Sequence, residues 1–144
     1  MKMGETRLVV RVHGPKGYAD VEMVADTGAT LTTITKTIAD EIGLVPAGRA
    51  MVKLADGSRR AVAVADADVE IRGDRAPVRV LIGSADQVSL LGLTSLETLG
   101  LKVNPVERTL EPSEFTLYAL IRRARNPGRV PTRVKNGELL RSPF

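Results

Sequence analysis

Hydrophobic and polar residues alternate along much of the chain, a pattern that is typical of half-buried β-strands. The stretches predicted to form strands are 7–12, 18–25, 50–54, 59–71, 77–82, 88–91 and a last hairpin at 102–110. Glycine, proline, asparagine and aspartate cluster between these stretches, which predicts tight turns there. The sequence therefore favours a mostly β domain.

Two short helices are predicted between the strands. The first spans 36–42, because isoleucines recur at every fourth position from Ile34 to Ile42. Thr35 is the expected N-cap of this helix, and Gly43 is expected to end it.

The second predicted helix spans 94–99 and ends at Gly100. Thr94 and Glu97 have the spacing of a capping box, in which the two side chains bind backbone amides of the first helical turn. The apolar segment 88–91 before this helix is expected to be a short buried strand.

The longest predicted strand, 59–71, lies between two hairpin turns. Asp56-Gly57 marks the first, since Asp-Gly between extended stretches is a strong hairpin signal, and 72–75 forms the second. Acidic residues alternate with apolar ones along the strand, which places them on one solvated face rather than in a metal site. These acidic residues are Asp66, Asp68 and Glu70.

The net charge of +4 originates in the C-terminal part of the chain. Residues 122–144 hold seven of the 21 Lys and Arg residues and one of the 17 Asp and Glu residues, which leaves 14 basic and 16 acidic residues in 1–121. We therefore expect a domain at 1–121 and a basic C-terminal extension at 122–144. The extension could contact a nucleic-acid backbone, but its only aromatic ring is that of Phe144, so a solvated or surface-packed tail is favoured.

The composition excludes several kinds of chemistry. The chain has no cysteine, and therefore no disulfide, thiolate metal site or cysteine nucleophile. The N-terminus lacks an apolar signal segment and no apolar run is long enough to span a membrane, so a cytoplasmic protein is expected. His13 is the single histidine and lies in a predicted turn, where a surface role is expected. We predict no metal and no cofactor.

One aspartate stands out by its position in the pattern. Asp26 follows a mostly apolar strand and precedes Thr27 and Gly28. A carboxylate at the end of an apolar strand is costly to bury unless it is hydrogen-bonded or protonated. Thr27 can offer its hydroxyl group, and Gly28 lets backbone amides approach closely. Asp-Thr-Gly is also common in ordinary turns, so its interpretation depends on the residues around it.

Two segments support a more specific interpretation. They are Ala25-Asp26-Thr27-Gly28-Ala29-Thr30 with Thr32-Thr33-Ile34, and Leu90-Leu91-Gly92 with Leu96 and Leu99-Gly100-Leu101. The first resembles the active-site segment of the retropepsin-like aspartic proteases, and the second resembles that family's hydrophobic-hydrophobic-Gly segment and its following helix. They occur in the family's order, within a resemblance that covers roughly 6–112. It implies a closed β-barrel-like domain with a flap hairpin and one or two short helices, used as a two-fold homodimer.

The number of catalytic carboxylates also points to a dimer. Two carboxylates about 3 Å apart share one proton, so that one activates water while the other protonates the substrate carbonyl. The chain has a single Asp-Thr-Gly, and its other candidates, Asp56 and Asp86, lie in a predicted turn and a predicted loop. A second copy of the chain, related by a two-fold axis, would place Asp26 beside its symmetry mate.

The resemblance assigns roles to further residues. It implies that Asp26 is catalytic, that Thr27 hydrogen-bonds across the two-fold axis and that Gly28 presents its backbone to the substrate. The hairpin tip at Ala55, Asp56 and Gly57 falls where the family has its flap. The residues expected to line the substrate groove are Ala29, Thr30, Val88 and Leu90, although Val88 and Leu90 also fit an ordinary core.

The chain departs from the viral pattern at three positions. Thr30 and Leu31 stand where retroviral enzymes carry acidic residues, and Leu93 stands where they carry an arginine. Because these ion-pair partners are absent together, the chain is expected to be closer to cellular, bacterial and archaeal members than to viral ones.

The hypothesis favoured by the sequence is an aspartic endopeptidase that cleaves extended polypeptides. Two alternatives remain: a catalytically silent dimerisation or peptide-binding module of the same fold, and a protein that associates with nucleic acid through its basic tail. Intact Asp26-Thr27-Gly28 favours the enzyme. Nucleic-acid binding through the tail would depend on salt and disappear when 122–144 is deleted.

Overall fold

A computed structural model describes the chain at residues 5–115, 133–135 and 138–140. The chain divides into two units, 1–113 and 114–144. The described residues of the second unit form one antiparallel hairpin, β10 (Arg133–Lys135) and β11 (Glu138–Leu140). The expected boundary at 121/122 lies outside the described residues. No helix in the described part of the chain is long and apolar enough to cross a membrane.

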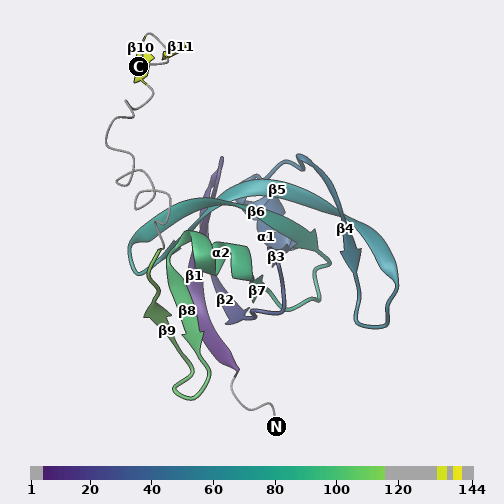
Figure 1. Ribbon diagram of the computed structural model, residues 1–144. Helices are drawn as coiled ribbons and strands as arrows, with labels where there is room; N and C mark the ends of the chain where they lie inside the picture. The colour runs from purple at the N-terminus through teal and green to yellow at the C-terminus, as the bar shows by residue number, and fades with distance from the viewer. Residues whose placement is uncertain (1–4, 116–132, 136–137, 141–144) are drawn as a thin grey trace. The chain divides into compact units, whose positions relative to one another are not determined.

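The first unit is a closed β-barrel from which one hairpin extends (Figure 1). Its strands are β1 (Thr6–Gly14), β2 (Gly17–Ala25), β3 (Thr32–Thr35), β4 (Gly48–Lys53), β5 (Arg59–Ile71), β6 (Asp74–Gly83), β7 (Leu90–Leu91), β8 (Leu101–Asn104) and β9 (Thr109–Pro112). Seven strands form one sheet in the order β1-β2-β7-β3-β6-β5-β4, and pairing of β1 with β5 closes it. β8 and β9 form a separate hairpin. The mostly β, closed barrel-like domain with two short helices that was expected from the sequence is confirmed.

Side chains from nearly every strand fill the barrel. Alternation along β5 buries Ala65, Ala67, Val69 and Ile71 on one face. The core also includes Val10, Val12, Val21, Met23, Ile34, Ala39, Ile42, Leu44, Val80, Leu91, Leu96 and Leu110. Burial of this apolar surface, which contributes roughly 25 cal/mol per Å², holds the barrel closed.

The acidic outer face of β5 is present as expected, and its carboxylates pair with basic side chains of neighbouring strands. Arg79 binds Asp66 at 3.1 Å and Arg75 binds Asp68 at 2.8 Å. Glu70 lies 2.7 Å from the Nε2 atom of His13, which belongs to β1 rather than to the turn that follows it. His13 is therefore a partly buried hydrogen-bonding partner of a neighbouring strand, not a freely exposed turn residue.

The first helix, α1 (Lys36–Ile42), has its predicted ends. The Thr35 hydroxyl accepts a hydrogen bond from the Ile38 amide at 3.3 Å, and Gly43 adopts a left-handed φ of 77°. The isoleucine pattern that predicted this helix nevertheless extends beyond it, because Ile34, its first member, belongs to β3. This strand was not predicted. Its β-branched residues pair in parallel with β6, a partner distant in the sequence that local periodicity does not reveal.

The second helix, α2 (Leu93–Thr98), begins differently from the prediction. Its N-cap is Gly92, without a side-chain cap, so the expected capping box of Thr94 and Glu97 is wrong. The Thr94 hydroxyl instead donates to the carbonyl of Thr30. The expected buried strand at 88–91 is also shorter: only Leu90–Leu91 pairs as β7, and Val88 is exposed.

Candidate active site

Asp26 lies directly after β2, where its backbone and its side chain are both hydrogen-bonded. Its amide donates to the carbonyl of Leu91 at 2.9 Å. One carboxylate oxygen, Oδ1, accepts the amide of Gly28 at 2.9 Å. The residue is half-buried, so the carboxylate remains accessible at the end of the strand. These contacts fix the orientation of the loop without enclosing the acid.

β7 joins the two segments that the sequence singled out. Leu90 and Leu91 pair in parallel with Val24 and Ala25 of β2, and Leu90 also pairs with Thr33 of β3. The short strand therefore lies between the two strands on either side of the Asp26 loop. Tertiary pairing thus brings both segments to one place.

The loop after Asp26 is also held by the start of α2. The amide of Leu93 donates to the carbonyl of Ala29 at 2.8 Å, and the amide of Thr94 donates to the carbonyl of Thr30 at 3.0 Å. Ala29 is half-buried and Thr30 is exposed. Their backbone carbonyls are thus used to anchor the loop.

A buried pair of hydroxyl groups reinforces this junction. The oxygens of Thr32 and Ser95 lie 2.6 Å apart, and the amide of Gly92 donates to Thr32 at 3.0 Å. Gly92 is buried, and a Cβ atom there would lie 2.4 Å from the carbonyl carbon of Leu31. Glycine is required at this position because the backbones approach too closely for any side chain.

Thr27 and Gly28 occupy the exposed tip of the loop. The Thr27 hydroxyl has no hydrogen-bond partner among the described residues of this single chain. Its predicted role, a hydrogen bond across a two-fold axis, involves a second copy and stays a prediction.

The hairpin between β4 and β5, called the flap hairpin below, has a self-supporting tip. The amide of Leu54 donates to the carbonyl of Ser58 at 2.8 Å. The carboxylate of Asp56 accepts the Ser58 hydroxyl and the Ser58 amide, at 2.5 and 2.9 Å. These two hydrogen bonds lower the pKa of the Asp56 carboxyl, because they favour its charged form. Gly57 has a φ of 86°, as a tight turn requires.

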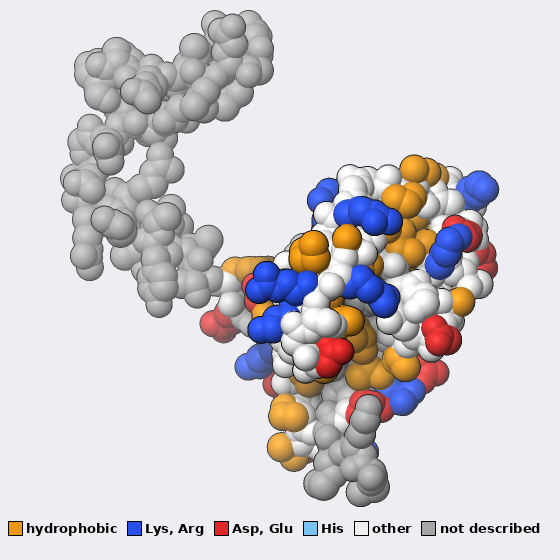
Figure 2. Space-filling model, turned by 90° about the vertical axis from the view of Figure 1, so that its right-hand side faces the viewer, with side chains coloured by type: hydrophobic (Ala, Val, Ile, Leu, Met, Phe, Trp, Pro, Cys, Tyr) orange, Lys and Arg blue, Asp and Glu red, His pale blue; other side chains and the backbone are white. Residues whose placement is uncertain are grey.

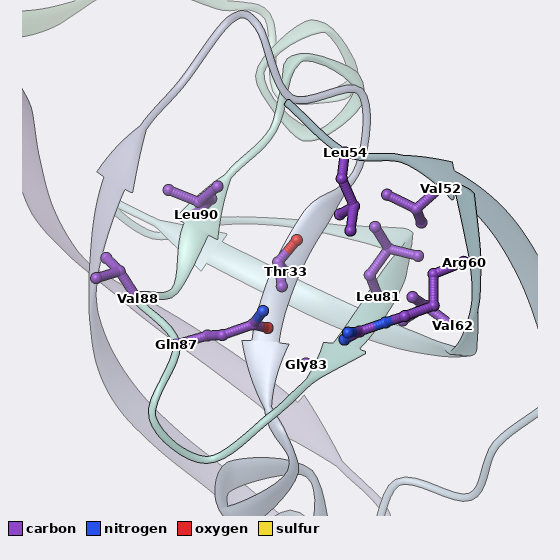
Figure 3. A pocket seen from close by; sticks show the side chains of 10 residues that line it. All are labelled: Thr33, Val52, Leu54, Arg60, Val62, Leu81, Gly83, Gln87, Val88 and Leu90. Atoms are coloured by element: carbon purple, nitrogen blue, oxygen red, sulfur yellow. The ribbon is translucent and has the colours of Figure 1, made fainter. Parts of the chain in front are cut away.

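A groove of about 330 Å³ separates the flap hairpin from the segment that leads into β7 (Figure 3). On the flap side, Val52 and Leu54 face it from β4 and its tip, and Arg60 and Val62 from β5. The other lining residues are Thr33, Leu81, Gly83, Gln87, Val88 and Leu90. Figure 2 looks onto the end of the domain that carries this hairpin, where hydrophobic and basic side chains lie next to one another.

The structure brings together only some of the residues that the sequence predicted for substrate binding. Val88 and Leu90 line the groove. Ala29, Thr30 and the predicted flap residues Ala55, Asp56 and Gly57 do not. Sequence reasoning missed Thr33, Val52, Leu54, Arg60, Val62, Leu81, Gly83 and Gln87. Alternation along β4 and β5 could have indicated Val52, Leu54, Arg60 and Val62 as a shared face. No local signal marks Thr33, Leu81 or Gln87.

The described residues contain no cluster of three or more His, Cys, Asp or Glu side chains that could hold a metal ion. The polar groups near the loop are instead one carboxylate, Asp26, and backbone amides and hydroxyl groups. This arrangement supports acid–base chemistry at a carboxylate, provided that a second acid is supplied.

Comparisons with known proteins agree with this fold. The family model described as "gag-polyprotein putative aspartyl protease" matches residues 14–98, more than half of the chain. The fold is similar to that of the EIAV protease in complex with the inhibitor HBY-793: the TM-score is 0.55, the identity is 16%, and the match covers 69% of this chain and 92% of that one. No curated protein matches the chain.

Two further solved structures match with lower TM-scores. The Simian Foamy Virus (mac) protease has a TM-score of 0.45 and 17% identity, over 62% of this chain and 92% of that one. The foamy viral protease-reverse transcriptase in complex with an RNA/DNA hybrid has a TM-score of 0.48 and 17% identity, over 90% of this chain and 16% of that one.

Proposed function

The chain belongs to the gag-polyprotein aspartyl protease family, and from this premise we propose that it is an aspartic endopeptidase that works as a homodimer. The observation that carries the proposal is the placement of Asp26. It is a half-buried carboxylate fixed at the end of β2 by the carbonyl of Leu91 and the amide of Gly28. One such carboxylate cannot both activate water and donate a proton, so a second copy must supply its partner.

The proposed mechanism uses the shared proton of two Asp26 side chains. The ionised carboxylate removes a proton from a water molecule held between the two acids. This water attacks the peptide carbonyl carbon, while the protonated carboxyl donates its hydrogen to the carbonyl oxygen. In the resulting tetrahedral diol, the first carboxyl gives the proton it took from water to the nitrogen, while the second carboxylate removes a proton from a diol hydroxyl group. The C–N bond breaks, the amine and the carboxylic acid leave, and the two acids again share one proton. Thr27 and Gly28 hold the loops of both protomers in register.

The proposed substrate is an extended polypeptide that lies between the Asp26 loops and the flap hairpins. Ala29, Thr30, Val88 and Leu90 would flank it from below, and Ala55, Asp56 and Gly57 would fold over it from above. An extended chain in such a groove gains affinity from main-chain hydrogen bonds and specificity from alternate side chains. The apolar walls formed by Val52 and Leu54 support this mode of binding.

Cleavage of an unfolded protein at about pH 3–7, the range in which carboxylate dyads titrate, tests the proposal. The native chain is compared with Asp26→Asn, which keeps the size of the side chain and an oxygen for the Gly28 amide. Cleavage by the native chain alone supports the proposal. Equal cleavage by both chains, or by neither while both are folded dimers, contradicts it, and the second outcome favours a silent peptide-binding module.

A mixing experiment tests whether one active site uses both protomers. Native chains are unfolded and refolded together with a threefold excess of Asp26→Asn, so that native chains make up about one quarter of the mixture. Random pairing then gives about one sixteenth of dimers with two intact acids, because such a dimer needs two native chains. Activity per native chain then falls to about a quarter. Activity that stays proportional to the native chains would contradict a shared dyad.

A further inference from the structure

The groove beside the flap hairpin is lined mostly by apolar side chains, together with one basic side chain and one amide side chain. Its apolar lining residues are Val52, Leu54, Val62, Leu81, Val88 and Leu90. Two long polar side chains, Arg60 and Gln87, also line it, and no aspartate or glutamate does. An apolar groove with a cation and without an anion is complementary to a side chain that has a hydrocarbon stem and a negative end.

Arg60 is placed to meet such a side chain. It lies opposite Val52 in the pairing of β5 with β4. In Figure 3 its side chain extends from β5 across the groove toward Gly83 and Gln87. Among the described residues no carboxylate lies within 4 Å of its guanidinium, which distinguishes it from strand arginines such as Arg75 and Arg79.

Gln87 supplies a second donor at the same end of the groove. Its Oε1 atom accepts the amide of Ser84 at 3.1 Å. With the oxygen used inside the loop, the side-chain NH₂ group is the one left to bind a ligand. Guanidinium and amide NH₂ groups are both donors, so their common partner is an acceptor, and a carboxylate makes the strongest charge-assisted hydrogen bond.

We propose that Arg60 is a specificity-determining residue that selects an acidic side chain, glutamate in preference to others, at one position of the polypeptide substrate. The two methylene groups of glutamate lie along the apolar walls and its carboxylate reaches Arg60 and Gln87. The same unpaired cation repels lysine and arginine, so the groove discriminates in both directions. The inference rests on the proposed endopeptidase function and adds a substrate class to it.

The test uses peptides that differ at a single residue. A neutral peptide that the native chain cleaves is varied with Glu, Gln, Leu and Lys at each position flanking the scissile bond, at about pH 6, where a glutamate side chain of ordinary pKa, about 4.3, is ionised. At one position kcat/KM for Glu should exceed that for Leu by about tenfold, because a hydrogen bond to a charged group contributes on that order.

Matched variants assign the preference to one side chain. Arg60→Gln should reduce the Glu-to-Leu ratio of kcat/KM by about tenfold, and Arg60→Glu should favour Lys instead. Arg59→Gln removes the same charge one residue away, on the opposite face of β5, and should leave the ratio unchanged. An unaltered ratio in Arg60→Gln, or no preference for Glu in the native chain, overturns the inference while the proposed function stands.

Failure of the proposed function is recognised separately. If the native chain cleaves no peptide, the same peptides are titrated against Asp26→Asn by fluorescence anisotropy. Tighter binding of the Glu peptide that is lost on adding Arg60→Gln upholds the acidic preference without catalysis. Equal binding of all peptides, or none, overturns it.

Discussion

The hydroxyl oxygens of Thr32 and Ser95 lie 2.6 Å apart although 63 residues separate them in the sequence. Both side chains are buried, and the amide of Gly92 donates to the same threonine oxygen. Leu91, the neighbour of Gly92, accepts the amide of Asp26. A short chain of hydrogen bonds therefore connects the interior of the barrel to the candidate catalytic loop.

Ser95→Ala should lower the free energy of unfolding by about 1–3 kcal/mol, since the buried Thr32 hydroxyl loses Ser95 and keeps only the Gly92 amide as a partner. Thr98→Ala is the matched control, because its exposed hydroxyl bonds only within α2 and its loss should cost less than about 0.5 kcal/mol. Urea denaturation measures both variants at one fixed protein concentration, because the apparent stability of a dimer depends on concentration. Equal effects would mean that the buried pair adds nothing specific.

Gly92→Ala should destabilise the domain by about 1–3 kcal/mol or more, because a Cβ atom would lie 2.4 Å from the Leu31 carbonyl carbon and force β3 and α2 apart. The adjacent Leu93→Ala, at an exposed position, should be much milder. Thermal unfolding followed by circular dichroism compares the two. A Gly92→Ala chain as stable as the native one would show that the loops can separate freely.

Val88→Ala tests whether Val88 acts in substrate binding or in the hydrophobic core. Val88 is 59% exposed, so its truncation should change the unfolding free energy by less than about 0.5 kcal/mol. If it contacts substrate, kcat/KM for an apolar peptide should fall about tenfold, as expected for lost methyl contacts in a hydrophobic pocket. Val45→Ala, exposed and absent from the groove lining, is the control for activity. A large loss of stability with unchanged kcat/KM would show that Val88 is a core residue and does not bind substrate.

Activity should be greatest at acidic to weakly acidic pH and decline as pH rises. In the proposed mechanism the two Asp26 side chains must share one proton, and alkaline solution removes it. Initial rates across about pH 3–8 measure this decline. The peptide used is neutral, so that titration of the substrate does not contribute to the pH profile. A rate that continues to rise into alkaline pH would contradict the dyad.

The tip of the flap hairpin should loosen in acid. Hydrogen bonds from Ser58 lower the pKa of Asp56 in the folded chain, so this carboxylate stabilises the tip fully above its unfolded value of about 3.9. The contribution is lost as pH falls through the lower folded value. The chemical shift of the Ser58 amide between about pH 2 and 6 should report the change, and Asp56→Asn should abolish this titration. A Ser58 signal that titrates alike in both chains would contradict this assignment.

Local sequence rules predicted the parts of the fold that local chemistry controls. The Asp56-Gly57 turn, the ends of α1 at Thr35 and Gly43, and the alternation along β5 each depend on neighbouring residues, and each is present. The position of Asp26 at the end of a strand was predicted for the same reason.

Tertiary structure decided what depends on partners distant in the sequence. β3 exists because β6 and β7 pair with it, and Thr94 bonds to the carbonyl of Thr30 rather than capping its own helix. The groove likewise gathers Arg60, Gln87 and Leu90 from separate elements. Periodicity records which face a side chain occupies, but parallel pairing and groove formation depend on contacts between segments many residues apart, and those are set only when the barrel closes.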